Sequence, residues 1–405
     1  MEAFHGKFYI AGEFKERYVI VDDGVIKGVK AEAPGMEVKS LPGYILPGGV
    51  DMHVHFRDPG ETDKEDFGTG SLSSILGGTT TVCDMPNNKV PVDTPEAFSS
   101  KLSAVRNKSY ADFALYQAAS SAVVRNAIGE KIFLGKSTGG LLTDLERCKW
   151  QDKVKVVHAE LQECLDLNFR ESDSLISHDM ARPLECEIDA IQHIFRYRLT
   201  KIHIAHVTSL RSLELAKSLG FTTEVTPHHI LLNNSVPIGP FGKVNPPLRK
   251  KSVQEELLNN LNSKLIDVIS SDHAPHKRKE KESFKEAPSG IPGVETRVPL
   301  VLWLQTKGFI SMGKAVSALM ERPAQICRIN KGYIAEGFDA DFISVDLKKP
   351  VRIREERLHS KCGWTPFGDF EGIFPDLVFL RGNLIVQEGE AISSPSGEFL
   401  DAEVK

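Results

Sequence analysis

Eight short apolar segments, each followed by a stretch long enough for an amphipathic helix, occupy the middle of this chain of 405 residues. The segments are 45–55, 79–85, 112–116, 131–134, 153–159, 201–206, 221–226 and 265–272. This alternation is typical of α/β folds with a parallel sheet, and eight units in roughly 280 residues fit a (β/α)8 barrel. A doubly wound open sheet is the alternative, but no GxGxxG motif follows the first segment. The sequence therefore predicts a TIM-type barrel over 45–332.

The sequence pattern at both ends of the chain differs from that in the middle. Residues 8–29 carry the short runs FYIAG, YVIVDDG and VIKGV, and residues 331–347 and 375–390 repeat this pattern of brief strands and glycine-rich turns. Helical periodicity is missing from these segments, which favours small antiparallel strands. We expect residues 1–44 and 333–405 to form one small composite β domain beside the barrel.

Composition excludes several classes of protein. Hydrophobic residues make up 41% and charged residues 26%, which argues against disorder, and a net charge of −5 indicates neither nucleic-acid nor membrane-surface binding. No segment approaches about 18 apolar residues and the N-terminus lacks a signal-peptide pattern, so we expect no membrane span and a cytoplasmic location. Six scattered cysteines without a CxxC pair favour reduced thiols over a disulfide framework.

Metal-binding side chains stand at the ends of several predicted strands, where barrels place their active sites. His53 and His55 are two positions apart, so both imidazoles can face one metal ion. His158, His206 and Asp272 end the fifth, sixth and eighth strands. One such residue is weak evidence, but five polar groups aimed at one barrel mouth would be costly without a ligand. The pattern predicts a metal site.

The fourth strand offers Lys131 as a further ligand. Two neighbouring divalent cations need a bridging negative charge, and a lysine carboxylated by CO2 presents a carbamate. Burial beside cations lowers the pKa of a lysine and so favours the neutral amine that this reaction requires. The alternative is an ordinary ammonium that reaches solvent, and Lys136 and Glu130 compete for the role.

Seven motifs resemble those of the dihydroorotases, in the amidohydrolase superfamily. They are GGVDMHVHFRDPG (48–60), DMPNN (84–88), HAE (158–160), HIAHVTS (203–209), EVTPHH (224–229), KVNPPLR (243–249) and SSDHAPH (270–276). The resemblance spans nearly the whole chain in family order, and the segment 332–346 is similar to the returning β segment of the family. HxH alone marks only the superfamily, whereas Arg57, Asn87 and DHAPH are much more specific.

The resemblance implies an enzyme that reversibly cyclises N-carbamoyl-L-aspartate to L-dihydroorotate in pyrimidine biosynthesis. It implies two Zn2+ ions that lower the pKa of a water between them. The implied ligands are His53, His55 and Asp272 for one ion, His158 and His206 for the other, and carboxylated Lys131 between them. Asp272 would act first as general base and then as general acid.

The resemblance also implies the substrate contacts. Arg57, Asn87 and His276 would bind the ring carboxylate, for which a planar guanidinium is suited. Asn245 and the backbone at Ser289 and Gly290 would contact the ring edge. A surface salt bridge for Arg57 and a turn role for Asn245 are the alternatives.

Three other groups have weaker signals. The segment 135–143 is either a mobile lid or a flexible connection, and the charged segment 277–290 is expected at the active-site rim. We expect a structural role, through local pairing on a helix, for His178, Arg182 and Glu187. We expect no metal-ligand role for His203, His228 and His229.

Two rival functions stay open. An allantoinase or hydantoinase-type cyclic amidohydrolase is the nearer one, and Arg57 argues against it because a substrate without a carboxylate would leave the guanidinium unsatisfied. A non-catalytic structural relative is the other, and the full ligand set argues against it. The partner is a small-molecule substrate; a homodimer and an association with aspartate carbamoyltransferase are compatible with the resemblance but have no sequence signature.

Overall fold

The computed structural model describes residues 1–33, 35–136 and 140–402. All eight predicted barrel strands are present. They are β5 (Gly49–Val54), β6 (Thr79–Asp84), β7 (Asp112–Leu115), β9 (Gly129–Phe133), β10 (Val154–His158), β11 (Ile202–Ile204), β12 (Thr222–Val225) and β13 (Val268–Ile269). A short strand, β8 (Gln117–Ala118), follows β7 and pairs with β9.

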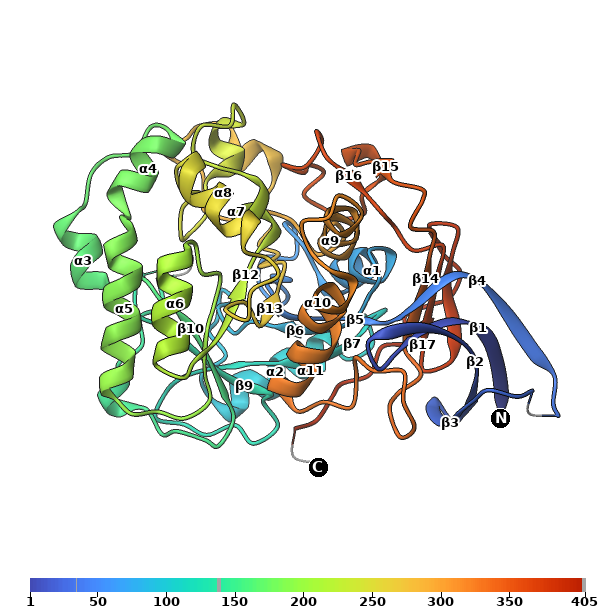
Figure 1. Cartoon of the computed structure of the whole chain (residues 1–405). Coiled ribbons are helices and arrows are strands. Elements are labelled where there is room, and N and C mark those ends of the chain that lie inside the picture. The colour runs from blue at the N-terminus through green and yellow to red at the C-terminus, as the bar shows by residue number, and fades with distance from the viewer. Residues whose placement is uncertain (34, 137–139, 403–405) are drawn as a thin grey trace.

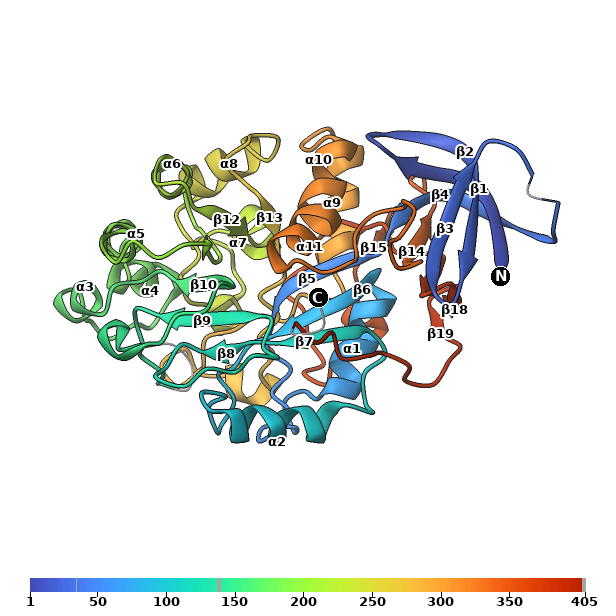
Figure 2. The same ribbon diagram turned by 90° about the horizontal axis from the view of Figure 1, so that it is seen from below.

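Parallel pairing closes these strands into a barrel. One sheet has the order β5-β6-β7 and the other β8-β9-β10-β11-β12-β13. The amide of Ile128 donates to Leu115 (2.9 Å) on one side, and on the other Val54 forms a bridge with His273, whose carbonyl accepts from the amide of His55 (2.8 Å). The predicted (β/α)8 barrel is confirmed, and Figure 2 shows its strands from below.

The helices surround the barrel, as Figure 1 shows. They are α1 (Phe67–Leu76), α2 (Pro95–Val105), α3 (Gln162–Leu167), α4 (Leu175–Ala181), α5 (Leu184–Arg196), α6 (Leu210–Ser218), α7 (Pro227–Leu231), α8 (Lys251–Asn259), α9 (Arg297–Thr306), α10 (Met312–Val316) and α11 (Arg322–Cys327). Short helical turns are η1 (Leu145–Arg147), η2 (Gly239–Gly242), η3 (Arg278–Lys281), the π-helical η4 (Ser317–Glu321) and η5 (Glu355–Arg357).

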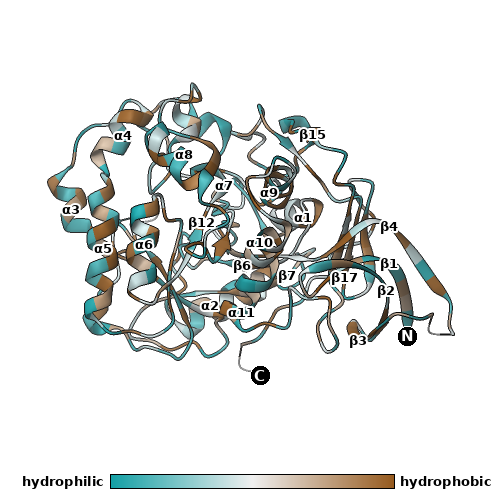
Figure 3. Ribbon diagram, in the orientation of Figure 1, coloured by the Kyte–Doolittle hydropathy of each residue, from teal (hydrophilic) through white to brown (hydrophobic). Residues whose placement is uncertain are grey.

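Helix α5 illustrates why these segments fold as they do. Its side chains Ile188, Ile191 and Ile194 recur at helical spacing and are buried. Figure 3 shows the resulting alternation of hydrophobic and hydrophilic residues along α5 and α6. Helix α6 begins at a cap in which the side chain of Ser209 accepts from the amide of Ser212. No helix among the described residues is long and apolar enough to cross a membrane.

The two chain ends build one mixed sheet, as expected. Its order is β19-β18-β17-β14-β4-β1-β2-β3. The strands are β1 (Glu2–Ile10), β2 (Glu13–Asp22), β3 (Val25–Lys30), β4 (Val38–Pro47), β14 (Phe342–Val345), β17 (Leu377–Leu380), β18 (Asn383–Gln387) and β19 (Glu390–Ala391). Strand β4 joins the two ends, because it pairs in parallel with β1 and antiparallel with β14.

The first predicted barrel strand, 45–55, is divided between the two sheets. Ile45 and Leu46 pair with Phe8 and Ile343 in the terminal sheet, and the barrel strand begins only at Gly49. The division falls at Gly48, where a Cβ atom would lie 2.2 Å from Oγ1 of Thr80. The backbone passes so close to β6 there that only glycine fits.

The C-terminal part of the chain also reaches the barrel. Strands β15 (Val351–Arg352) and β16 (Glu371–Gly372) lie beside α9, and Ile373 donates from its amide to the carbonyl of Pro299 (3.0 Å). Residues 397–402 run along β7, where the amide of Phe113 donates to Glu398 (2.9 Å) and that of Leu400 to Phe113 (2.8 Å). The division into 1–44 plus 333–405 and 45–332 remains a proposal.

Two cysteines correct the expectation of reduced thiols. Cys164 in α3 and Cys186 in α5 form a disulfide, while Cys83, Cys148, Cys327 and Cys362 are free. Packing of α3 on α5 brings the two Cα atoms within 5.2 Å although 22 positions separate them in sequence. Sequence spacing carried no signal for this pair, because the contact depends on how the two helices pack.

Candidate active site

A pocket opens at the C-terminal ends of the barrel strands. It is lined by every predicted site residue except His276, namely His53, His55, Arg57, Asn87, Lys131, His158, His206, Asn245, Asp272, Ser289 and Gly290. His276 lies behind Arg57, with 3.3 Å between its Nε2 and one guanidinium nitrogen. Segments from most of the chain length thus meet in one place.

His53, His55 and Asp272 form a group that can hold a metal ion. Their candidate ligand atoms all lie within 4.8 Å of one another, and Oδ1 of Asp272 is 3.3 Å from Nε2 of His53 and 3.2 Å from that of His55. Burial lowers the pKa of His55 to about 3, which leaves its nitrogen free of a second proton. Burial alone would raise the pKa of Asp272, but His53 and His55 hold it well below its ordinary value.

Lys131, His158 and His206 stand on the next strands around the barrel. Nζ of Lys131 lies 3.2 Å from Nε2 of His53, and Nδ1 of His158 lies 3.0 Å from Nε2 of His206. Burial lowers the pKa of Lys131 to about 8 and that of His206 well below its usual range. Nδ1 of His206 is buried without a hydrogen-bond partner. Burial therefore favours the uncharged form of the two imidazoles and shifts Lys131 toward its neutral amine, and uncharged nitrogens are the form that binds metal.

The backbone is strained at two of these positions. His206 has φ +37° and Asp272 φ +45°, both in the left-handed region that side chains other than glycine rarely adopt. Such conformations persist where surrounding structure enforces them, and they cluster at functional sites. His206 stands shortly after β11 and Asp272 shortly after β13, and both side chains line the pocket.

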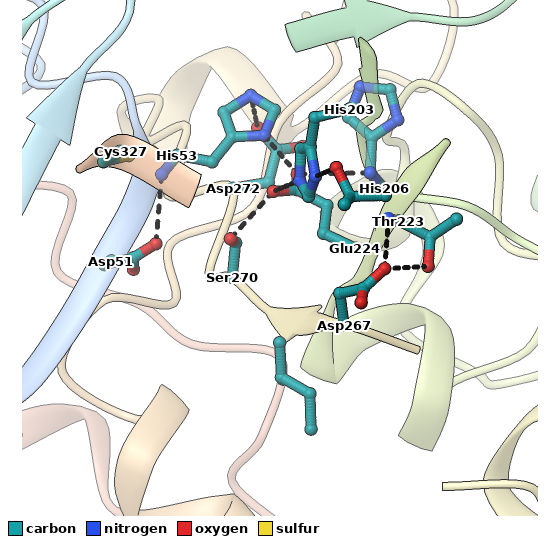
Figure 4. Close-up of polar contacts among 12 residues, drawn as sticks. Asp51, His53, His203, His206, Thr223, Glu224, Asp267, Ser270, Asp272 and Cys327 are labelled. Carbon is teal, nitrogen blue, oxygen red and sulfur yellow. Dashed lines mark hydrogen bonds and ion pairs between the residues drawn. The ribbon is translucent and has the colours of Figure 1, made fainter. Parts of the chain in front are cut away.

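Glu224 is a site residue that the sequence analysis missed. Its Oε1 accepts from Nδ1 of His53 (2.5 Å), and its Oε2 lies 3.2 Å from Nε2 of His203 and accepts from Oγ of Ser270 (2.8 Å). Figure 4 shows the carboxylate among these side chains. A carboxylate behind a histidine fixes the tautomer that can bind metal. The available signal was a glutamate inside the otherwise uncharged strand FTTEVT.

Glu160 plays the same part for His158. Its Oε2 lies 3.0 Å from Nε2 of His158, and Arg182 donates to both of its oxygens at 3.0 and 2.6 Å. Although burial would raise the pKa of Glu160, Arg182 and His158 hold it well below its ordinary value. The motif HAE contained this residue, but its role became visible only with the strand geometry.

The pairing predicted for His178, Arg182 and Glu187 is wrong in one respect. None of them pairs locally on its helix: Arg182 contacts Glu160, and Glu187 accepts from Thr208 (2.8 Å). Nε2 of His178 lies 3.0 Å from both the carbonyl of Val244 and Oδ1 of Asn245. Their segment faces neighbouring strand-end loops, so tertiary contacts replace pairs along the helix.

The predicted carboxylate contacts lie together on one side of the pocket. Arg57 is 4% exposed, and its Nε is buried without a hydrogen-bond partner. Oδ1 of Asn87 lies 2.7 Å from Nδ1 of His55, so Asn87 also orients a proposed metal ligand. Burial and the charge of Arg57 lower the pKa of His276 well below its usual range.

The predicted ring-edge contacts adjoin this group, because Nε2 of His276 lies 3.1 Å from the carbonyl oxygen of Ser289. Oγ of Ser289 donates to Oδ1 of Asn245 (3.1 Å), and the amide of Gly290 donates to the carbonyl of Lys243 (3.0 Å). A Cβ atom at Gly290 would lie 2.3 Å from the carbonyl oxygen of Ala274. Of the predicted lid at 135–143, residues 137–139 lie outside the described residues.

A (β/α)8 barrel with histidines, an aspartate and a lysine gathered at its mouth defines the class of metal-dependent hydrolases. Residues 44–385 match the family model described as "Amidohydrolase family". The chain is 44% identical to the dihydroorotase of Thermoplasma volcanium over 98% of this chain and 97% of the relative. It is 38% identical to that of Archaeoglobus fulgidus, with 94% and 96% covered.

Solved structures agree with the fold. The L-hydantoinase (dihydropyrimidinase) from Arthrobacter aurescens superposes with a TM-score of 0.91 at 25% identity, covering 98% of this chain and 99% of that one. The chain belongs to the amidohydrolase family and, within it, to the dihydroorotases. It is an enzyme, a hydrolase acting on cyclic amides. The resemblance stated from the motifs is confirmed.

Proposed function

We propose that this enzyme reversibly cyclises N-carbamoyl-L-aspartate to L-dihydroorotate, with two Zn2+ ions at the barrel mouth, in pyrimidine biosynthesis. The observation that carries the substrate is the environment of Arg57. No carboxylate of the described residues lies within 4.0 Å of this buried guanidinium, and its Nε has no partner. A buried cation with an open donor calls for an anion, and dihydroorotate has a ring carboxylate that hydantoin and allantoin lack.

The residues fit the two metal ions. Neutral imidazoles and an ionised aspartate are ligands that zinc prefers. Nδ1 of His158 and Nε2 of His206 face each other at 3.0 Å, so the two nitrogens could bind one ion. His53, His55 and Asp272 would hold one ion, and His158 and His206 the other.

Lys131 would bridge the two ions as a carbamate. An unmodified ammonium would repel them, but a pKa of about 8 makes the neutral amine accessible to CO2. The competing candidates are worse placed: Oε2 of Glu130 lies 3.6 Å from Nζ of Lys155, outside the pocket lining, and Lys136 is exposed.

When bound, the ions supply Lewis-acid polarisation of the ring amide and a water of lowered pKa. Asp272, ionised and aimed at the same place, takes the proton of the attacking water and delivers it to the leaving ring nitrogen. Arg57 holds the ring carboxylate with Asn87 and His276. Asn245, Ser289 and Gly290 hold the opposite edge of the ring, so the scissile amide is presented in one orientation.

A hydrolysis assay on L-dihydroorotate, hydantoin and allantoin tests this proposal, with zinc content measured on the same preparation. We expect turnover of dihydroorotate alone. Arg57→Ala should lower kcat/KM for dihydroorotate by roughly 10^3-fold or more, since it removes a charged hydrogen-bonding partner, and should leave the zinc content unchanged. Preference for either other ring would contradict the role of Arg57, and a zinc-free, inactive protein would favour a structural relative.

The remaining proposals concern the setting of the enzyme. A homodimer, an association with aspartate carbamoyltransferase and a cytoplasmic location stay predictions. Size-exclusion chromatography with light scattering, on the enzyme alone and mixed with the transferase, tests the first two.

A further inference from the structure

Among the described residues, Lys281 differs from two other buried lysines, Lys101 and Lys331. Nζ of Lys101 lies 2.5 Å from a carboxylate oxygen of Asp84, and that of Lys331 contacts three aspartates. Lys281, in η3, is fully buried (0% exposed). No carboxylate of the described residues lies within 4.0 Å of its Nζ, so its buried ammonium lacks the ion pair that the other two have.

Main-chain carbonyls take the place of carboxylates around Lys281. Its Nζ donates to the carbonyl oxygens of Lys243 (3.0 Å), Pro288 (2.8 Å) and Gly290 (3.2 Å). The ring of Trp364 covers it, with 5.8 Å from Nζ to the ring centroid. Three N–H groups therefore meet three acceptors, which satisfies the hydrogen bonds of an ammonium but leaves its charge without a counter-ion.

The three carbonyls belong to the two segments that carry the ring-edge contacts. Lys243 stands two residues before Asn245, and Pro288 and Gly290 flank Ser289. The segments are also joined by the amide of Gly290 donating to Lys243 and by the hydroxyl of Ser289 donating to Asn245. Nζ of Lys243 adds a bond to the carbonyl of Phe284 (2.8 Å), earlier in the same loop. Lys281 is thus the side chain that holds both segments from behind.

Stability alone does not account for this arrangement. Burial and the nearby charge of Lys243 lower the pKa of Lys281 to about 7, so the protein pays for keeping an ammonium here. An apolar side chain of the same length would fill the space without that cost. Lys281 instead serves to hold the two loops in a fixed relative position, because its ammonium contacts three carbonyl groups at once.

We propose that Lys281 is a positioning residue that sets the spacing between Asn245 and Ser289–Gly290, and so determines how tightly the ring edge of the substrate is held. The inference rests on the proposed dihydroorotase function. The metal ligands lie on other segments. Arg57 is linked to the loop through His276, whose Nε2 lies 3.3 Å from Arg57 and 3.1 Å from the carbonyl oxygen of Ser289.

The test compares Lys281→Met, which keeps the length of the side chain but removes its donors, with Lys279→Met, an exposed lysine in the same helical turn. We expect KM for L-dihydroorotate to rise about tenfold in the first variant, with kcat changed less than threefold, since the interaction holds ground state and transition state alike. Lys279→Met should match the wild type. Zinc content should be equal in all three proteins.

A double-mutant cycle separates positioning from general support. Asn245→Ala should raise KM less in the Lys281→Met background than in the wild-type background, because the contact is already misplaced there. If Lys281→Met does not accumulate as folded protein, Lys281→Gln enters the same cycle.

The outcomes distinguish the two proposals. A wild-type enzyme that does not turn over dihydroorotate overturns the proposed function and this inference with it. Wild-type turnover with an unchanged KM in Lys281→Met, or with equal effects of Asn245→Ala in both backgrounds, overturns the inference alone.

Discussion

Two clusters of buried ionisable side chains lie in different parts of the molecule. At the junction between the barrel and the terminal sheet, Nζ of Lys331 lies 2.5, 2.7 and 2.9 Å from Asp112, Asp339 and Asp341, and Arg381 also contacts Asp112. Although burial would lower it, these aspartates raise the pKa of Lys331. Every charge there has a partner.

The barrel mouth is the opposite case. Burial lowers the pKa of His55 and of His206, Nδ1 of His206 and Nε of Arg57 have no hydrogen-bond partner, and the backbone is strained at Asp272. Compensated charges stabilise a fold, whereas unsatisfied buried donors lower stability unless a ligand completes them. The Lys331 cluster therefore stabilises the fold, whereas the cluster at the barrel mouth is suited to bind a ligand.

The largest expected effect separates two aspartates of the same strand region. Asp272 faces the mouth, whereas Asp267 pairs with Lys217 (2.6 Å) and Arg322 (3.0 Å). Asp272→Ala should lower kcat by about 10^4-fold, the upper range for loss of a general acid–base group. Asp267→Asn should affect thermal stability more than kcat. Steady-state kinetics and calorimetry of both variants check this, and comparable losses of kcat would abolish the contrast.

A substitution at the junction between the barrel and the terminal sheet should lower the stability of the protein rather than its activity. Lys331→Met removes the cation shared by Asp112, Asp339 and Asp341, of which only Asp112 keeps a second cation, Arg381. We expect this to lower the free energy of unfolding by about 3–5 kcal/mol. The exposed Lys348→Met serves as the control. Denaturant unfolding gives the free energy, and kcat/KM measured on the folded fraction should equal that of the wild type. A large loss of kcat/KM would mean that the two clusters are not independent.

Glu224 connects the barrel framework to the candidate metal site, because it lies in a barrel strand and its carboxylate orients His53. Glu224→Ala should weaken zinc binding about 10–100-fold, the usual effect of removing a carboxylate behind a metal-binding histidine. Glu224→Gln, which still accepts a hydrogen bond, should lose less. Competition with a chelator measures the affinity. Identical zinc affinities in wild type and Glu224→Ala would show that His53 needs no such support.

The smallest expected effect concerns acid pH. Burial and the charge of Arg182 lower the pKa of His178 to about 4, so the unfolded chain binds a proton near pH 6.5 and the folded chain does not. Stability from this group is therefore lost as pH falls from about 6.5 to 4, by about 1.4 kcal/mol at pH 5.5. His178→Gln should show a correspondingly smaller loss between pH 7.5 and 5.5 in denaturant unfolding. Parallel pH profiles would contradict a neutral His178.

Much of the fold was readable from the sequence, because hydrophobic periodicity is a local property. The eight barrel strands were predicted within a few residues of their positions, and the exception, 45–55, was divided at Gly48 by a close approach to Thr80 that no local pattern reports. The short strands at both chain ends could be predicted from their brief apolar runs and glycine-rich turns. The parallel pairing of β1 with β4 could not, since it depends on where the chain returns.

The candidate site, like the fold, could be predicted from the sequence only in part. Side chains at strand ends, such as His53 and Asp272, could be predicted to meet because a barrel brings the C-terminal ends of its strands to one mouth. Glu160 and Glu224 could not be assigned, because a carboxylate within a strand has a role only once its partner histidine is placed. Lys281 was expected in a charged rim segment and proved fully buried.

Strand periodicity and motif order are local features of the chain, so the class of fold, the candidate ligand-bearing residues and the family could all be predicted from the sequence. Only the tertiary structure decided which groups are neutral, which donors are unsatisfied, that Cys164 joins Cys186, and that Lys281 holds two loops together. The physical reason is that charge state and hydrogen-bond satisfaction depend on burial and on neighbours distant in sequence, and these exist only after the barrel has closed.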